Sequence, residues 1–179
     1  MVAGTLKGNL VFYEVDGLKS STQISITKNE SKITGISFMP FAADNEEKLL
    51  ISSADSRIRI INVRDKSLYR VYKGLELKNG GSFATFSYDG VFIIAAGEDR
   101  YVTIWDVNPI DLNVQYKGMM SGIMYRQDNI KSSENIKFLG SHSYITSAII
   151  YEDAHSLREI DYIIVADIQG FINIYENKV

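Results

Sequence analysis

The sequence predicts an all-β protein whose sheets stack side by side like the blades of a β-propeller. Two observations support this fold class. A short strand-like segment recurs four times at about the length of one blade, and a tract of small or apolar residues precedes each copy. We therefore expect a propeller fragment of about three and a half four-stranded blades, part of a seven-bladed ring.

The recurring segments are six residues long and rich in β-branched and aromatic side chains, which favour strands. They are Gly8–Tyr13, Ser56–Ile61, Arg100–Trp105 and Gly170–Tyr175. Their last residues lie 48, 44 and 70 residues apart. The first two intervals are close to the blade length of about 40–45 residues, and the third indicates an insertion of about 25 residues.

Each recurring segment is preceded by its small or apolar tract and a polar turn, which together predict a β-hairpin. The tracts are Val2–Thr5, Ile51–Ala54, Ile94–Gly97 and Ile164–Asp167. Small residues suit a strand that crowds toward the axis of a ring. The β-branched segment suits the next strand, which packs between neighbouring blades.

Further strands are expected on both sides of these hairpins. The upstream candidates are Ile33–Phe38, Phe83–Phe86 and Ile145–Ile150, and the downstream candidates are Ser21–Ile26, Leu68–Lys73 and Val114–Lys117. Charged and Gln residues in the downstream group fit edge strands, which must avoid pairing with other chains. The strand count is then three, four, four and three, with one helical turn at Ala154–Ile160 as an alternative for that segment.

These strands divide the chain into four blades and one insertion. The bounds are 1–28 for a partial blade 1, 29–74 for blade 2, 75–118 for blade 3, 118–141 for the insertion and 142–179 for a partial blade 4. The insertion contains three methionines, a tyrosine and an arginine. Two interpretations remain open for it: an adaptable contact surface, or a loop that packs its apolar residues over the propeller edge.

A motif in the third recurring segment resembles a known repeat. Gly97-Glu98-Asp99-Arg100-Tyr101-Val102-Thr103-Ile104-Trp105-Asp106 resembles the core signature of a WD40 repeat, and Ser52–Ile60 is similar to it. The resemblance implies that Asp55 and Asp99 sit in the tight turn between the second and third strands of a blade. There they would bond the turn backbone and a His from the preceding loop, the place where His142 stands in the last blade.

A closer resemblance rests on the order of six segments along the chain. They are SKITGI, SSADSRIRI, VYKG, FSYDG, GEDRYVTIW and YITSAI. This order is similar to the C-terminal half of the Rab-binding (rabphilin-like) WD-repeat proteins of recycling endosomes and their fungal relatives. The resemblance implies a trafficking or signalling adaptor, and a Rab-type small GTPase as partner if the rest of such a chain is present. It implies a cytoplasmic location, with peripheral attachment to endosomal or Golgi membranes as an alternative.

The chain departs from the WD40 pattern in every blade. Only Trp105 keeps the tryptophan, which is replaced elsewhere by Tyr13, Ile61 and Tyr175, and Lys7 and Gln169 replace the turn Asp. No blade holds His, turn Asp and Trp together. Because a buried hydrogen-bond network stabilises only when each member is satisfied, we expect the blades to depend mainly on apolar packing.

The composition argues against catalysis and against metal binding. The chain has no cysteine and only two histidines, His142 and His155, so neither a thiolate site nor a histidine metal cluster is expected. A net charge of −3 gives no basic bias toward nucleic acid. We expect no enzyme activity, no cofactor and no metal.

Partners are expected instead on the face that carries the turns between second and third strands. Lys32, Arg57, Glu98, Arg100, Tyr101 and Tyr144 should project there. Arg and Tyr are favoured in binding hot spots, so the function predicted is a scaffold for proteins or peptides. The alternative is a peripheral membrane module that reads acidic lipids through Lys32, Arg57 and Arg100.

An open run of blades also exposes two apolar flanks. Ring closure removes exposed edges and faces. The sequence therefore predicts that this chain is a fragment that packs against the remaining propeller blades of a longer chain, that it pairs with a second copy or a partner, or that it aggregates when alone.

Overall fold

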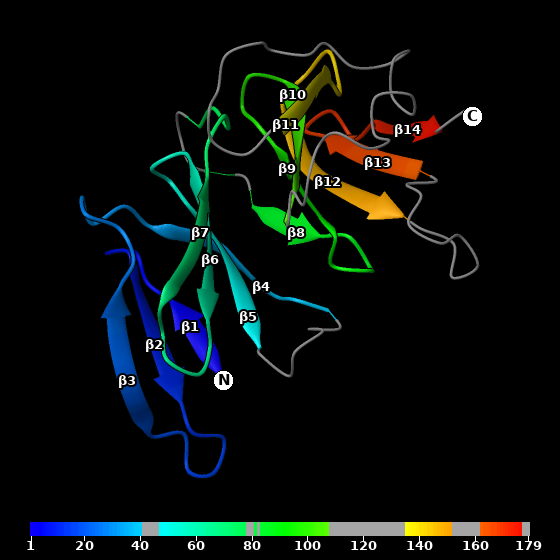
Figure 1. Cartoon of the computed structure of the whole chain (residues 1–179). Coiled ribbons are helices and arrows are strands. Elements are labelled where there is room, and N and C mark those ends of the chain that lie inside the picture. Colours follow the sequence, from blue (N-terminus) through cyan, green and yellow to red (C-terminus); the bar gives the residue numbers. More distant parts are fainter. Residues whose placement is uncertain (41–46, 78–80, 82, 108–134, 152–161, 177–179) are drawn as a thin grey trace.

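A computed structural model describes residues 1–40, 47–77, 81, 83–107, 135–151 and 162–176. Within this part of the chain there are 14 strands in four antiparallel sheets, and no helix (Figure 1). The sheets contain three, four, four and three strands along the chain, which confirms the predicted count and the propeller architecture. The described residues contain no helix long and apolar enough to span a membrane.

The strands of each sheet follow one another in chain order. Blade 1 contains β1 (Val2–Gly4), β2 (Asn9–Tyr13) and β3 (Ser20–Ser25), and blade 2 contains β4 (Ile33–Phe38), β5 (Lys48–Ser53), β6 (Arg57–Asn62) and β7 (Leu68–Tyr72). Blade 3 contains β8 (Ala84–Phe86), β9 (Phe92–Ala96), β10 (Tyr101–Asp106) and β11 (Asn135–Leu139). Blade 4 contains β12 (Ile145–Tyr151), β13 (Tyr162–Asp167) and β14 (Ile172–Glu176).

Blade 3 differs from the prediction at its fourth strand. β11 pairs with β10 along its whole length, from Tyr101 opposite Leu139 to Trp105 opposite Asn135. The prediction had assigned this place to Val114–Lys117, which lies outside the described residues, and had counted 135–139 within the insertion at 118–141. That part of the prediction was wrong, because the long connection lies between the third and fourth strands of one blade and not between two blades.

The first strands of the four sheets lie next to one another. β1 contacts β4, β4 contacts β8, and β8 contacts β12. The approach is close at Gly35, where a Cβ atom would lie 2.4 Å from the Cβ of Phe83. These strands therefore surround the axis. The small-residue tracts had been predicted to form the strand nearest the axis, and in blades 2 to 4 that prediction was wrong, because the tracts lie in the second strands β5, β9 and β13.

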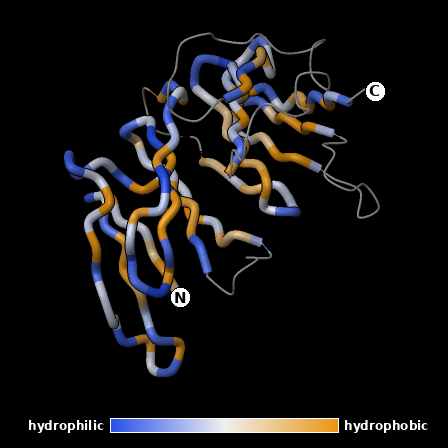
Figure 2. Tube along the Cα trace, in the orientation of Figure 1, coloured by the Kyte–Doolittle hydropathy of each residue, from blue (hydrophilic) through white to orange (hydrophobic). Residues whose placement is uncertain are grey.

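Alternating side chains of each central strand pack against different neighbouring blades. In β9, Ile93 and Ala95 join a core shared with blade 2, whereas Phe92, Ile94 and Ala96 join a core shared with blade 4. A third core joins blades 1 and 2. Since strand side chains point alternately to the two faces, this two-sided burial is the physical basis of the stack. Figure 2 shows the hydrophobic residues concentrated along the strands.

The outer flank of blade 4 remains apolar and exposed. Its exposed large side chains are Ile149, Tyr151, Tyr162, Ile172 and Ile174. Opposed residues share one face of the sheet, and Ile149, Ile164 and Ile174 form one such cross-strand row. This flank is apolar, like the faces that are buried between neighbouring blades.

Candidate protein-binding face

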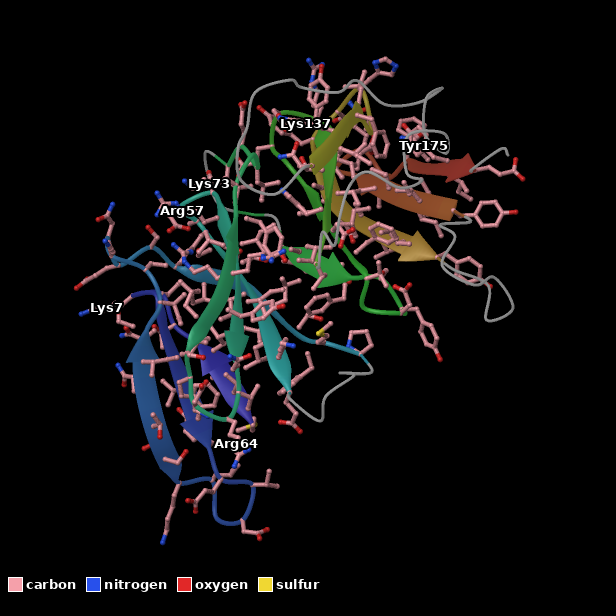
Figure 3. All side chains as sticks on the ribbon, viewed as in Figure 1. Lys7, Arg57, Arg64, Lys73, Lys137 and Tyr175 are labelled. Carbon is pink, nitrogen blue, oxygen red and sulfur yellow. The ribbon has the colours of Figure 1, made fainter. Side chains whose placement is uncertain are left out.

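The turns that lead into β2, β6, β10 and β14 reach one end of the stack. Figure 3 shows Lys7, in the first of these turns, and Arg57, directly after the second, at the end opposite to Arg64. Arg64 lies in the β6–β7 turn. We call the first end the turn face, defined by the turns 5–8, 54–56, 97–100 and 168–171 together with the loops that enter each blade.

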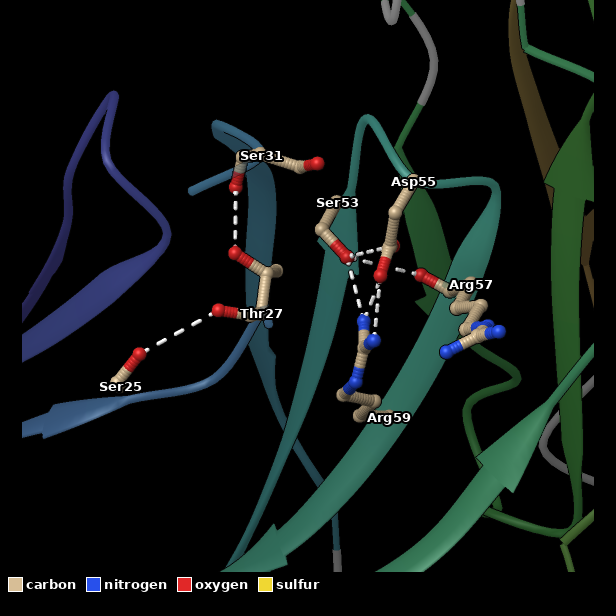
Figure 4. Close-up of polar contacts among 7 residues, drawn as sticks. All are labelled: Ser25, Thr27, Ser31, Ser53, Asp55, Arg57 and Arg59. Carbon is tan, nitrogen blue, oxygen red and sulfur yellow. Dashed lines mark hydrogen bonds and ion pairs between the residues drawn. The ribbon is translucent and has the colours of Figure 1, made fainter. Parts of the chain in front are cut away.

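In blade 2 the turn is held by a compact network within one hairpin. The Arg59 guanidinium donates to both Asp55 carboxylate oxygens, at 3.1 and 2.5 Å, and also to Ser53 Oγ at 2.7 Å. Ser53 Oγ in turn donates to Asp55 at 2.6 Å (Figure 4). Arg59 is only 6% exposed although it lies in the middle of β6. This network supplies locally the contact that the WD40 resemblance assigned to a histidine.

Asp55 is charged within this network. Burial alone would raise the pKa of its carboxyl group, but the hydrogen bonds from Arg59 and Ser53 outweigh burial and keep the pKa below its ordinary value of 3.8. The ionised form is therefore the one that the fold stabilises.

In blade 3 the equivalent carboxylate obtains its cation from another strand. Lys137 Nζ of β11 lies 2.5 Å from Asp99, and the same ammonium group lies 5.1 Å from the centre of the Tyr101 ring. Asp99 also accepts a weak hydrogen bond from the backbone N–H of Tyr101, at 3.3 Å. The turn of blade 3 is thus fastened to β11, the fourth strand of the same blade.

In blade 4 the turn depends on a carboxylate that the motif did not predict. Asp167 Oδ1 accepts the backbone N–H groups of Gln169 and Phe171, and Oδ2 accepts from Ser141 Oγ at 2.7 Å. The bond from Ser141 and the backbone bonds lower the pKa of Asp167, against the effect of burial. His142 had been predicted to make the contact that Ser141 makes, but its own side chain is exposed.

The signature residue Trp105 links neighbouring blades. Its indole Nε1 donates to the carbonyl of Lys73, directly after the last strand of blade 2, at 3.0 Å. Tyr175 makes the corresponding contact in blade 4, where its hydroxyl donates to the carbonyl of Gly140, after the last strand of blade 3, at 2.9 Å. Tyr can therefore replace Trp here because both combine a large apolar ring with a donor at its far end. Asp106, the last residue of the signature, ends β10 and is half-buried.

An open groove on the turn face brings together residues from two blades. Glu98, Asp99 and Arg100 from the β9–β10 turn form one side, and His142, Ser143 and Tyr144 from the loop entering blade 4 form the other. Three of the predicted partner-binding residues, Glu98, Arg100 and Tyr144, thus share one site. Ser143 had not been predicted.

The other predicted partner-binding residues lie outside this groove. Arg57 is exposed at the start of β6, and Tyr101 is 37% exposed at the start of β10. Lys32 is half-buried, and its carbonyl accepts the backbone N–H of Ala54. In the same way, the carbonyl of Tyr144 accepts the backbone N–H of Ile168. The loops that enter blades 2 and 4 are therefore fixed to the turn face by equivalent backbone bonds.

Sequence reasoning missed the cations that accompany the turn carboxylates. A signal was present for Arg59, because it is the one charged residue within the apolar stretch Ile58–Ile61. No local signal identified Lys137, which is 38 positions beyond Asp99 in the chain.

Comparison with known proteins gives two informative similarities. The chain is 35% identical over 154 residues to WD repeat-containing protein 44 of Xenopus laevis, a match that covers 83% of the chain and 15% of that protein. It is 32% identical over 87 residues to protein tipD of Dictyostelium discoideum, covering 48% of the chain and 14% of that protein. The chain thus spans about one seventh of the length of each relative. No protein-family model matches it.

Proposed function

We propose that this chain, a set of WD repeats within a β-propeller, is a non-catalytic scaffold that binds proteins or peptides through its turn face. The groove between blades 3 and 4 carries this proposal, because it combines charged, hydroxyl and aromatic groups from two sheets. Arg and Tyr in such a site combine large contact area with directed hydrogen bonds. The rigid blades below hold the groove residues in place.

A site-specific photocrosslinking experiment tests this role. The full chain carrying a benzoylphenylalanine at position 144 is expected to form adducts with cellular proteins, and the same photoreactive residue at position 64 should form few of them. Position 64 is a matched control because Arg64 is also exposed in a turn, at the other end of the stack. Equal adducts at both positions, or none at position 144 while the chain still captures proteins, would contradict the proposal.

The finer proposal is a trafficking adaptor. It rests on the similarity to WD repeat-containing protein 44 and on the resemblance to Rab-binding WD-repeat proteins. A Rab-type GTPase would be a partner if the rest of such a chain is present, since the resemblance places that activity ahead of the propeller. We expect the tagged chain to co-localise with endosomal or Golgi markers. A uniform distribution of the wild-type chain, identical to that of the Arg100→Glu variant, would oppose the adaptor proposal.

The lipid-binding alternative makes a different prediction. Arg57 and Arg100 are exposed on the turn face, whereas Lys32 is half-buried. Salt-sensitive co-sedimentation of the chain with anionic vesicles, lost in the Arg57→Glu and Arg100→Glu double variant, would favour lipid binding over the scaffold.

We also propose that the outer flank of blade 4 binds the remaining propeller blades or a second copy. Ile172 and Ile174, at 66% and 64% exposure, support this. Light scattering after size-exclusion chromatography should show the chain alone self-associating, and Ile174→Asp should reduce the association. A stable monomer of 20.2 kDa would oppose the proposal.

A further inference from the structure

Arg100 occupies a backbone conformation that two other blades assign to glycine. Its φ is +71°, compared with +73° for Gly8 and +86° for Gly170 at the equivalent turn positions. Side chains with a Cβ rarely adopt this left-handed conformation because the Cβ crowds the backbone. The sequence therefore accepts strain at Arg100 where glycine would avoid it.

At the fourth equivalent position, Ser56, a structural contact accounts for the strained conformation. Ser56 has a φ of +60°, and its Oγ accepts the backbone N–H of Leu77 at 3.1 Å, which fixes the connection to the next blade. Among the described residues the Arg100 side chain has no such bond, and it is exposed in the groove. Residues held in such strained conformations cluster at functional sites, and among the described left-handed residues other than glycine Arg100 is the one that lines the groove.

The carboxylates next to Arg100 are already engaged. Glu98 accepts the backbone N–H of Gly81 at 3.2 Å, and Asp99 pairs with Lys137. The guanidinium group is therefore presented to the groove, opposite the side chains of His142, Ser143 and Tyr144, all of which can donate hydrogen bonds.

An apolar surface adjoins these donors. Tyr144 is 56% exposed and Ile168 is 67% exposed, and a 2.8 Å bond from the Ile168 N–H to the Tyr144 carbonyl keeps the two together. A ligand seated on Arg100 would thus meet exposed aromatic and aliphatic side chains next to it.

We propose that the groove binds a peptide segment of a protein partner, in which a carboxylate side chain pairs with Arg100 and a large apolar side chain packs against Tyr144 and Ile168. The proposal rests on the scaffold function and specifies the chemistry of its ligand. A planar guanidinium can pair with a carboxylate through two parallel hydrogen bonds, which gives direction as well as attraction.

The probe for this inference is a phage-displayed library of random peptides, selected on the immobilised full chain. Enriched peptides should contain Asp or Glu within a few positions of Leu, Ile, Phe or Tyr. An enriched peptide should bind about tenfold more weakly to Arg100→Gly, as expected for loss of a charge-assisted hydrogen bond. Its affinity for the wild type should fall with added salt, and this dependence should be smaller for the variant.

Arg100→Gly is the informative variant because glycine suits the left-handed turn, so the fold should persist while the charge is lost. Arg64→Gln is the matched control, because Arg64 is exposed in a turn at the other end of the stack, and this variant should retain the wild-type affinity. Enriched peptides without acidic residues, or acidic peptides that bind Arg100→Gly as well as the wild type, would overturn this inference and leave the scaffold function standing. Failure to enrich any peptide, with photoadducts still formed at position 144, would also overturn it. Failure of both assays would instead remove the scaffold function itself.

Discussion

The turns of blades 2 and 3 stand at the same place in the repeat but use it differently. In blade 2, Asp55 pairs with Arg59 of the same hairpin, and the arginine is buried. In blade 3, Asp99 pairs with Lys137 of a strand that arrives after a long connection, and the next residue, Arg100, is exposed in a groove. One turn closes its polar network within itself, and the other leaves a cation available to a ligand.

The difference shows how a repeat can separate stability from binding. A carboxylate satisfied by a buried partner contributes to the fold and has nothing left to offer at the surface. When the partner comes from a neighbouring strand, the rest of the turn can carry other groups. The following predictions test whether the two turns differ in this way, from the largest expected effect to the smallest.

Arg59→Met should destabilise the chain most, by about 3 kcal/mol, because it leaves Asp55 as an unpaired, mostly buried charge. Denaturation can be followed by fluorescence of Trp105, the only tryptophan, which is buried. Adding Asp55→Asn to this variant should recover part of the loss, since the unpaired charge is gone. Additive losses for the two substitutions would show that the network is not coupled.

Lys137→Met should cost about 1.5 kcal/mol, less than the change at Arg59. The lysine makes one contact with Asp99, and both side chains are 17% exposed, so water can partly replace the bond. Urea denaturation of both variants under one condition gives the comparison. Equal losses would mean that the two turns are energetically alike.

Acid should weaken the contribution of the blade 2 turn. The folded-state pKa of Asp55 lies below 3.8, so its stabilising effect is complete above that value and is lost as the pH falls through the lower folded pKa. The free-energy difference between the wild type and Asp55→Asn should therefore shrink as the pH falls below 3.8 and through the lower folded pKa. A difference that stays constant over this range would show that the carboxylate charge is not what stabilises the turn.

Glycine substitutions at Ser56 and Arg100, two of the left-handed residues, should give the smallest and most selective effects. Arg100→Gly should change stability by less than about 0.5 kcal/mol, because relief of backbone strain offsets the greater entropy of the unfolded chain. Ser56→Gly gains the same relief but loses the bond to Leu77, and should cost about 1 kcal/mol. Thermal melts of both variants test this, and a clear loss at Arg100 would assign that residue a structural role.

Local patterns predicted most of the strands. The upstream strand Ile33–Phe38 has the predicted bounds, and the four hairpins lie within a few residues of their expected places. These features depend on neighbours in the sequence, namely the alternation of side chains and the turn residues between strands. The fourth strand of blade 3 was misplaced because the pattern of Val114–Lys117 does not show which segment pairs with β10, and that pairing belongs to Asn135–Leu139.

The sequence by itself determined a stack of β-hairpins with a shared period and a turn face rich in Arg and Tyr. Tertiary structure alone decided that Lys137 pairs with Asp99, that Ser141 and not His142 bonds the last turn, and that Arg100 and Tyr144 share a groove. The physical reason is the distance along the chain over which each interaction acts. Strand pattern acts between residues a few positions apart, whereas these contacts join side chains that meet only when separate strands and blades have packed together.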